Sequence, residues 1–132
     1  MLAEKLVAAA RRGVDVRVVI TLRGNVERLN RYVAVTANRL WRGGVKVYLA
    51  PGMTHRKVMS VDGVWAYLGT GNFDELSLRN NREAGVTVLS ASLVGGLDRQ
   101  VLELAQARAE RLQELLPLPA NLLWLELMKL WF

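Results

Sequence analysis

The sequence contains no cysteine and only one histidine among its 132 residues. The absence of cysteine excludes disulfides, thiolate metal ligands and cysteine nucleophiles, and it suits a reducing compartment such as the cytosol. A single histidine excludes a zinc site built from several imidazoles of one chain, and also a one-chain mechanism that needs two imidazoles. Any reaction that uses a second histidine therefore requires a partner.

Positive charge is what the sequence has in excess. Eighteen Lys and Arg residues against twelve Asp and Glu give a formal net charge of +6. This balance favours anionic partners, namely nucleic acid, an acidic membrane surface or a phosphate-bearing substrate. The alternative is a basic protein without a special partner. The hydrophobic content of 52% and the length suit a single folded domain.

Hydrophobic patterning predicts alternating helices and strands. Glycines at 13 and 43–44 are typical helix stops, and Asp62-Gly63 is a favoured two-residue hairpin turn. The expected elements are a helix at 3–12, a strand at 14–22, a helix at 27–42, a strand at 45–49, a hairpin of 55–61 with 64–68, a strand at 83–89 and a helix at 92–116. This order predicts an α/β fold in which a mixed β-sheet is flanked by helices.

The C-terminal residues 117–132 differ in character, because they are apolar with few charges after two prolines. As a helix, residues 120–132 would be about 20 Å long, too short for a bilayer core of about 30 Å. Such a helix suits a membrane interface, with Trp124, Trp131 and Phe132 as anchors, or packing on this domain or another subunit. We therefore expect a domain over 1–116 and an apolar helix over 117–132.

The segment HRKVMSVD at residues 55–62 carries the clearest chemical signal. Residues two apart on a strand share one face, so His55 and Lys57 are predicted to lie side by side. Such a lysine neutralises phosphate oxygens while the histidine attacks phosphorus or transfers a proton. The carboxylate of Asp62, near this cluster, would help to hold the imidazole in a useful state.

A second segment, GTGN at residues 69–72, follows the hairpin. Its glycines allow the backbone to approach an anion closely, while Thr70 and Asn72 supply neutral hydrogen bonds. Each piece alone has an ordinary explanation, since a lone histidine on a strand is usually structural and Asp-Gly is usually only a turn. Their order and spacing together are much more specific.

The combined pattern H-x-K-x-x-x-x-D, six residues, then G-[ST]-x-N resembles the signature of the phospholipase D superfamily. The flank FDELSLRNNRE at 73–83 is similar to that of bacterial cardiolipin synthases. The resemblance implies a phospholipase D-like half-domain over 1–116 that performs phosphodiester chemistry without a metal or another cofactor. One histidine would form a phosphohistidine intermediate while a second, from another motif copy, protonates the leaving alcohol.

By the same resemblance, His55 is the nucleophile or the general acid, and Asp62 supports the site. Glu83 matches the acidic residue that orients the histidine ring; alternatively it is an ordinary strand-edge carboxylate. The residues implied to be catalytic are His55, Lys57, Asp62 and Glu83, and those implied to bind the substrate phosphate are Lys57, Thr70 and Asn72.

Only one motif copy occurs in the sequence, so the second must come from a homodimer mate or a missing N-terminal half. We favour a phospholipase D-type enzyme that transfers or hydrolyses glycerophospholipids, as cardiolipin synthases do. The alternatives are a single-motif homodimeric endonuclease acting on nucleic acid and a partial domain inactive without its second half. We expect a cytoplasmic protein, with peripheral membrane contact through 120–132 as a further possibility.

Overall fold

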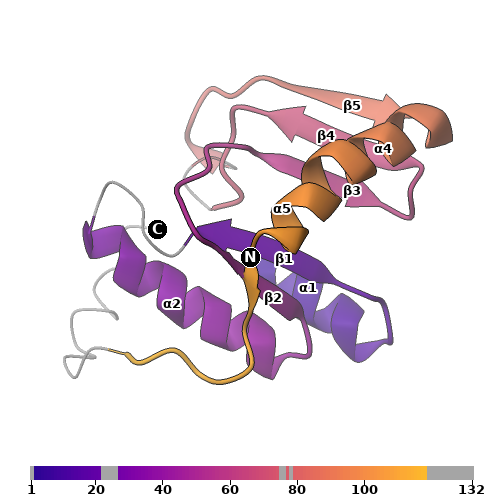
Figure 1. Cartoon of the computed structure of the whole chain (residues 1–132). Coiled ribbons are helices and arrows are strands. Elements are labelled where there is room, and N and C mark those ends of the chain that lie inside the picture. The colour runs from indigo at the N-terminus through magenta and orange to yellow at the C-terminus, as the bar shows by residue number, and fades with distance from the viewer. Residues whose placement is uncertain (1, 22–26, 75–76, 78, 119–132) are drawn as a thin grey trace. The chain divides into compact units, whose positions relative to one another are not determined.

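The computed structural model describes residues 2–21, 27–74, 77 and 79–118, and the chain divides into two units (Figure 1). The first unit combines Met1–Thr54 with Arg108–Phe132, and the second comprises His55–Ala107. Each unit contains a three-stranded sheet and at least one helix. The predicted α/β class is confirmed, but the strands form two separate sheets, of which the first is mixed.

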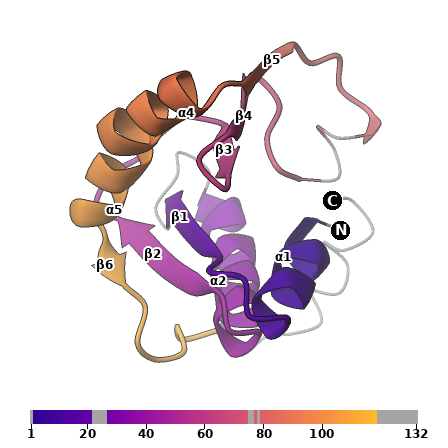
Figure 2. The same ribbon diagram turned by 90° about the vertical axis from the view of Figure 1, so that its right-hand side faces the viewer.

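In the first unit the strand order is β1-β2-β6 (Figure 2). β1 (Arg17–Thr21) is parallel to β2 (Lys46–Ala50), whereas β6 (Glu110–Arg111) is antiparallel to β2. Two parallel neighbours need a crossover connection, and here α2 (Glu27–Arg42) provides it. α1 (Leu2–Arg11) precedes β1 and contacts α2.

The core of the first unit lies between its helices and its sheet. The buried residues of its hydrophobic cluster are Ala37, Leu40, Val45, Val47 and Leu112. α1 contributes apolar residues at helical spacing, from Ala3 and Leu6 to Val7 and Ala10, which pack against this cluster. Burying one aliphatic side chain of this kind stabilises a fold by about 1.5–3 kcal/mol, so the cluster fixes how α1, α2 and the sheet pack.

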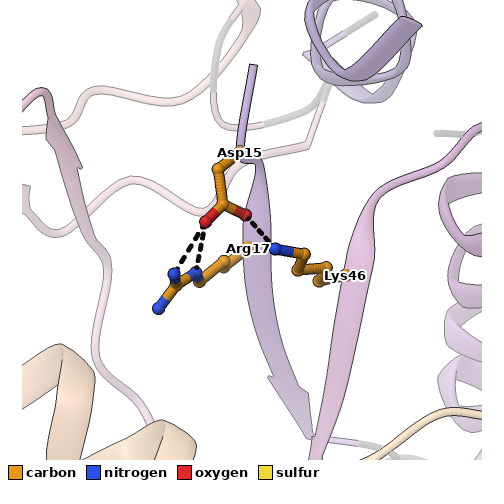
Figure 3. Close-up of polar contacts among 3 residues, drawn as sticks. All are labelled: Asp15, Arg17 and Lys46. Atoms are coloured by element: carbon orange, nitrogen blue, oxygen red, sulfur yellow. Dashed lines mark hydrogen bonds and ion pairs between the residues drawn. The ribbon is translucent and has the colours of Figure 1, made fainter. Parts of the chain in front are cut away.

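Asp15 connects the beginnings of the two parallel strands (Figure 3). Its Oδ2 accepts hydrogen bonds from Nε of Arg17 at 3.0 Å and from Nη2 at 2.7 Å, and its Oδ1 lies 2.8 Å from Nζ of Lys46. Arg17 and Lys46 are register partners on β1 and β2. The hydrogen bonds from Arg17 and then from Lys46 lower the pKa of Asp15 to about 2.

We expect the variant Asp15→Asn to have a free energy of unfolding that depends less on pH in the acidic range. The pKa of Asp15 falls from 3.8 to about 2 in the folded protein, so its stabilisation is present above the higher value and lost as the pH drops through the lower one. The effect is modest and weakened by salt, because the three side chains are exposed. Urea unfolding between about pH 7 and about pH 2 measures it, and equal pH profiles for both proteins would contradict the prediction.

The second unit contains an antiparallel sheet of order β3-β4-β5. β3 (Val58–Val61) pairs with β4 (Trp65–Gly69), which pairs with β5 (Gly85–Leu89). α4 (Ala91–Leu97) contacts β4 and β5, and its Val94 and the β4 residue Ala66 are fully buried. The helix continues as the π-helical segment η1 (Asp98–Glu103) and α5 (Leu104–Ala107).

The hairpin between β3 and β4 differs from its prediction by one residue. Val61 pairs with Trp65, so the loop has the three residues Asp62, Gly63 and Val64 instead of two. Asp62 and Gly63 have φ values of 52° and 67°. Aspartate and glycine tolerate this left-handed backbone better than most residues, which explains both residues at this turn.

β5 is an edge strand with little cover. Val86 is 63% exposed and Leu89 is 81% exposed, and the strand GVTVL contains no charged residue. Its outer backbone groups have no strand partner among the described residues.

The helix predicted over 92–116 is wrong beyond Ala107. The chain leaves the helix there, forms β6, and the amide of Leu112 donates to the carbonyl of Val47 at 2.9 Å. Leucine spacing at helical steps misled the prediction, because Leu112 is buried by strand pairing instead. From residue 119 on, the helix predicted over 117–132 lies outside the described residues. In the part of the chain that is described, no helix has the length and apolarity to cross a membrane.

Candidate functional site

Three segments meet at one end of the sheet in the second unit: the residues before β3, after β4 and before β5. The amide of Gly69 donates to the carbonyl of Lys57 at 3.1 Å, one step beyond the β3-β4 ladder. The amide of Thr70 donates to the carbonyl of Ala84 at 2.9 Å, one step beyond the β4-β5 ladder. The strand register therefore brings most of the sequence-predicted site residues to the same end of one sheet.

His55 and Lys57 precede β3, so the prediction that they lie on a strand is wrong. A hydrogen bond connects them instead: Nζ of Lys57 donates to the backbone carbonyl oxygen of His55 at 3.0 Å. Lys57 is only 8% exposed, whereas His55 is exposed. A nearly buried ammonium needs oxygen partners to keep its charge. Lys57 thus places a positive charge at the backbone of an exposed histidine.

Thr70 and Glu83 form the shortest polar contact of the site. Oγ1 of Thr70 donates to Oε2 of Glu83 at 2.6 Å, and the amide of Ala84 donates back to the same hydroxyl at 3.0 Å. Oγ1 is also 3.3 Å from the carbonyl of Ala84, but its single proton is better used on the closer, charged acceptor. The second oxygen of Glu83 accepts from Nδ2 of Asn81 at 3.2 Å.

Glu83 is held in its ionised form by this network. The hydrogen bond from Thr70 lowers its pKa most, partial desolvation opposes this, and hydrogen bonds from Asn81 and Ser77 together with the charge of Lys57 lower the pKa further. The Glu83 carboxylate therefore organises the loop after β4 and lies in the field of the buried ammonium.

Three further polar residues of this loop, Asp74, Ser77 and Asn81, were not predicted to belong to the site. Ser77 is 6% exposed, and its amide donates to Oδ1 of Asp74 at 2.8 Å. The spacing Asp-x-x-Ser is typical of a side chain that caps a following turn, and this was the available signal. These residues support Glu83 from the loop between β4 and β5.

Glycines allow the close packing around this network. A Cβ added to Gly71 would lie 3.3 Å from Cγ of Glu83, so the loop passes directly over that side chain. Gly69 and Gly85 are cross-strand partners, and the ring of Tyr67 lies against both. The same ring meets Phe73 edge to face at a centroid distance of 6.1 Å. The end of β4 is thus fixed by an aromatic side chain that lies over two glycines.

The two remaining predicted residues lie in different places. Asn72 is exposed and follows Gly71 in the loop after β4, near the Thr70 and Glu83 pair. Asp62 lies at the opposite end of β3, five residues from Lys57, which is roughly 17 Å in an extended strand. The expectation that Asp62 lies near the cationic cluster is therefore wrong. Its observed position is the left-handed turn of the hairpin.

Among the described residues, no group of three or more His, Cys, Asp or Glu side chains could hold a metal ion. What is assembled is an exposed imidazole, a buried ammonium and a loop of small hydrogen-bonding residues beside an ionised carboxylate. These groups suit the binding of a phosphate group. They also suit nucleophilic attack on its phosphorus atom or proton transfer to one of its oxygens.

We expect Thr70→Val to raise the pKa of Glu83 toward its ordinary value, because the hydrogen bond from Thr70 is the largest cause of its lowering. Thr70→Ser, which keeps the hydroxyl, should leave the pKa of Glu83 low. Carboxyl-carbon NMR titration of Glu83 in the three proteins measures the shift. An unchanged pKa in Thr70→Val would mean that another group controls the carboxylate.

The comparisons with known proteins agree with one another. The family model described as "Cardiolipin synthase, PLD-like domain" matches residues 1–105. The chain is 34% identical over 103 residues to a cardiolipin synthase of Listeria welshimeri, covering 77% of this chain and 21% of that protein. It is 35% identical over 100 residues to cardiolipin synthase A of Pseudomonas aeruginosa, covering 72% of this chain and 20% of the relative.

A solved structure has the same fold. It is that of Nuc from Salmonella typhimurium, described as a phospholipase D family member, with a TM-score of 0.74 and 26% identity over 86% of this chain and 74% of that one. The chain thus spans about a fifth of the length of the curated relatives it matches. On the family match and these identities, the chain belongs to the phospholipase D family, in the group of cardiolipin synthase-like domains.

Proposed function

We propose that this chain supplies one half of the active site of a phosphodiester-transfer enzyme that acts on glycerophospholipids. The observation that carries the proposal is the grouping of His55, Lys57, Thr70 and Glu83 at one end of a single sheet. Asn72 belongs to the same loop. The curated relatives named as cardiolipin synthases support a phosphatidyl group as the transferred unit.

In the proposed reaction, an imidazole nitrogen of His55 attacks phosphorus. A nitrogen–phosphorus bond forms, the bond to the leaving alcohol breaks, and the leaving oxygen takes a proton from a second imidazolium. That second imidazole then accepts a proton from water or an acceptor alcohol, whose oxygen attacks phosphorus and releases His55. In the alternative assignment the two imidazoles exchange roles.

The other residues serve the phosphate and the loop. Lys57 would neutralise the non-bridging oxygens, on which charge grows in the transition state. Thr70 and Asn72 would add neutral hydrogen bonds to the same oxygens, which for Thr70 requires its hydroxyl proton to turn from Glu83 to the phosphate. Glu83 is proposed to act on the site through its hydrogen bond with Thr70. It is also proposed to orient the ring of His55. Asp62 is proposed to support the site only through the hairpin turn.

The second imidazole must come from outside these 132 residues, because His55 is the only histidine in them. A second copy of the chain could supply it across a two-fold axis, and so could another segment of a longer polypeptide. The chain spans about a fifth of the length of the cardiolipin synthases it matches, which fits the second source.

The substrate class is tested with phosphatidylglycerol vesicles in the presence of EDTA and a small primary alcohol. The proposal expects a phosphatidyl-alcohol product and free glycerol, both dependent on His55. If the isolated chain is inactive, the same assay is repeated after adding a separately expressed segment that carries a second H-x-K-x-x-x-x-D motif. Inactivity in both assays would overturn the proposal.

A single-motif endonuclease is the second candidate, favoured by the net charge of +6 and the lone motif. Cleavage of single-stranded DNA in EDTA, lost in His55→Ala, with no lipid product, would select it over the lipid enzyme. For the lipid enzyme we propose a peripheral membrane position, to which the apolar residues 120–132 would contribute. Vesicle flotation with and without those residues tests that contribution.

A further inference from the structure

The first unit contains a cavity of about 710 Å³ between α1 and α2. This volume is within the usual range for small-molecule sites. All its lining residues belong to the first unit, whereas every candidate catalytic residue belongs to the second. The cavity is therefore not made of the residues of the proposed active site.

Four arginines line the cavity: Arg11, Arg12, Arg39 and Arg42. Among the described residues that line the cavity, Glu4 is the only acidic one, and its Oε1 lies 3.0 Å from Nη2 of Arg39. Within the described part of the chain, the other three guanidinium groups have no acidic partner. The described lining residues therefore carry a formal charge of +3, from four arginines less one glutamate.

The helix ends explain only part of this charge. Arg11 ends α1, and Arg39 and Arg42 lie in the last turn of α2, where cations compensate the helix dipole. Each helix C-terminus carries about half a negative charge, so two of them offset about one of the three surplus charges. Roughly two positive charges remain for an external anion.

The walls of the cavity are fixed by packing. Asn38 is 5% exposed, and its side chain donates to the carbonyl of Leu116 at 2.9 Å and accepts from the amide of Leu116 at 2.8 Å. These two bonds hold the segment that brings Leu118 to the lining. A Cβ on Gly43 would lie 2.5 Å from a methyl group of Val7, so the glycine just after α2 permits the close approach of α1 and α2.

We propose that this cavity binds the phosphate group of an ester that carries an apolar chain, namely a single anionic phospholipid molecule. Planar guanidinium groups match phosphate oxygens in pairs, so the arginines select phosphate. Val7, Val35 and Leu118 add apolar wall beside them, which an inorganic ion would leave unused. The site is additional to the proposed active site.

Binding of water-soluble dihexanoyl phosphatidylglycerol, measured by calorimetry in the His55→Ala chain to prevent turnover, tests the site. The double variant Arg12→Gln/Arg42→Gln should raise Kd by about 10-fold or more. The matched control is Arg99→Gln/Arg108→Gln, which removes the same charge from exposed positions outside the cavity and should change Kd by less than about 2-fold. Equal weakening of lipid binding in both double variants would overturn the site, since only the net charge of the protein would then matter.

Two further arms identify the ligand. Leu118→Ser should weaken binding of the lipid but not of inorganic phosphate, and equal affinity for the two ligands would overturn the apolar part of the proposal. An oligonucleotide that competes for the cavity, and loses affinity in Arg12→Gln/Arg42→Gln, would assign it to nucleic acid instead. Because these measurements are made without turnover, they stand or fail separately from the proposed reaction.

Discussion

We expect His55→Ala to lower the proposed phosphodiester transfer by at least about 10³-fold, which is the usual loss when a nucleophile or general acid is removed. His55 is exposed, so the variant should fold normally. Product formation from phosphatidylglycerol measures the effect. The control is Arg56→Gln, which removes the neighbouring exposed cation and should change the rate by only a few-fold. Residual activity within about 10-fold of the wild type would exclude His55 from the chemistry.

A mixture of wild-type protein and His55→Ala tests where the second imidazole comes from. If each site uses His55 from both copies of a dimer, an equimolar mixture after subunit exchange has about one quarter of the wild-type activity. If each chain works with a different partner segment, the mixture has about one half of the wild-type activity, because the inactive copies do not affect the active ones. The ratio separates a homodimer from a longer polypeptide.

Lys57→Met should lower the transfer rate by about 10²-fold or more while leaving the free energy of unfolding unchanged or raised. The activity falls because the charge that neutralises the phosphate oxygens is lost. Stability is retained because Lys57 is 8% exposed, and replacing a buried charge with an apolar side chain of similar length is often neutral or stabilising.

The two readouts for Lys57 are a transfer assay and urea unfolding on the same preparation. Lys46→Met is the comparison, since it removes an exposed lysine that pairs with Asp15 and should affect stability slightly and activity very little. If Lys57→Met unfolded the protein, the ammonium would be a structural group, and its assignment to phosphate binding would fail.

The sequence predicted the site best where the spacing is local. Lys57, Thr70 and Glu83 meet because the hairpin and the strand after it are short and consecutive, so the order of the motifs fixes which ends lie together. The same geometry explains why the position predicted for Asp62 was wrong. A hairpin turn lies at the far end from the residues that begin its first strand, even when all of them belong to one motif.

Pairing between distant segments could not be predicted from the sequence pattern. β6 has two residues, and its partner β2 lies about sixty positions earlier in the chain. Leucines at helical spacing around Leu112 indicated a helix, and burial against Val47 decided otherwise. The division into two sheets follows from such contacts, because periodicity identifies strands but not their neighbours.

The exposed edge of β5 has a consequence for handling the protein. An uncharged strand with Val86 and Leu89 largely in solvent offers a template for strand addition by another molecule. Self-association through this edge would produce particles whose size grows with concentration and has no relation to catalysis. Sedimentation measured on the wild type alone would then count such particles as functional dimers. Leu89→Lys, which charges the edge without touching the site, provides the reference sample for that measurement.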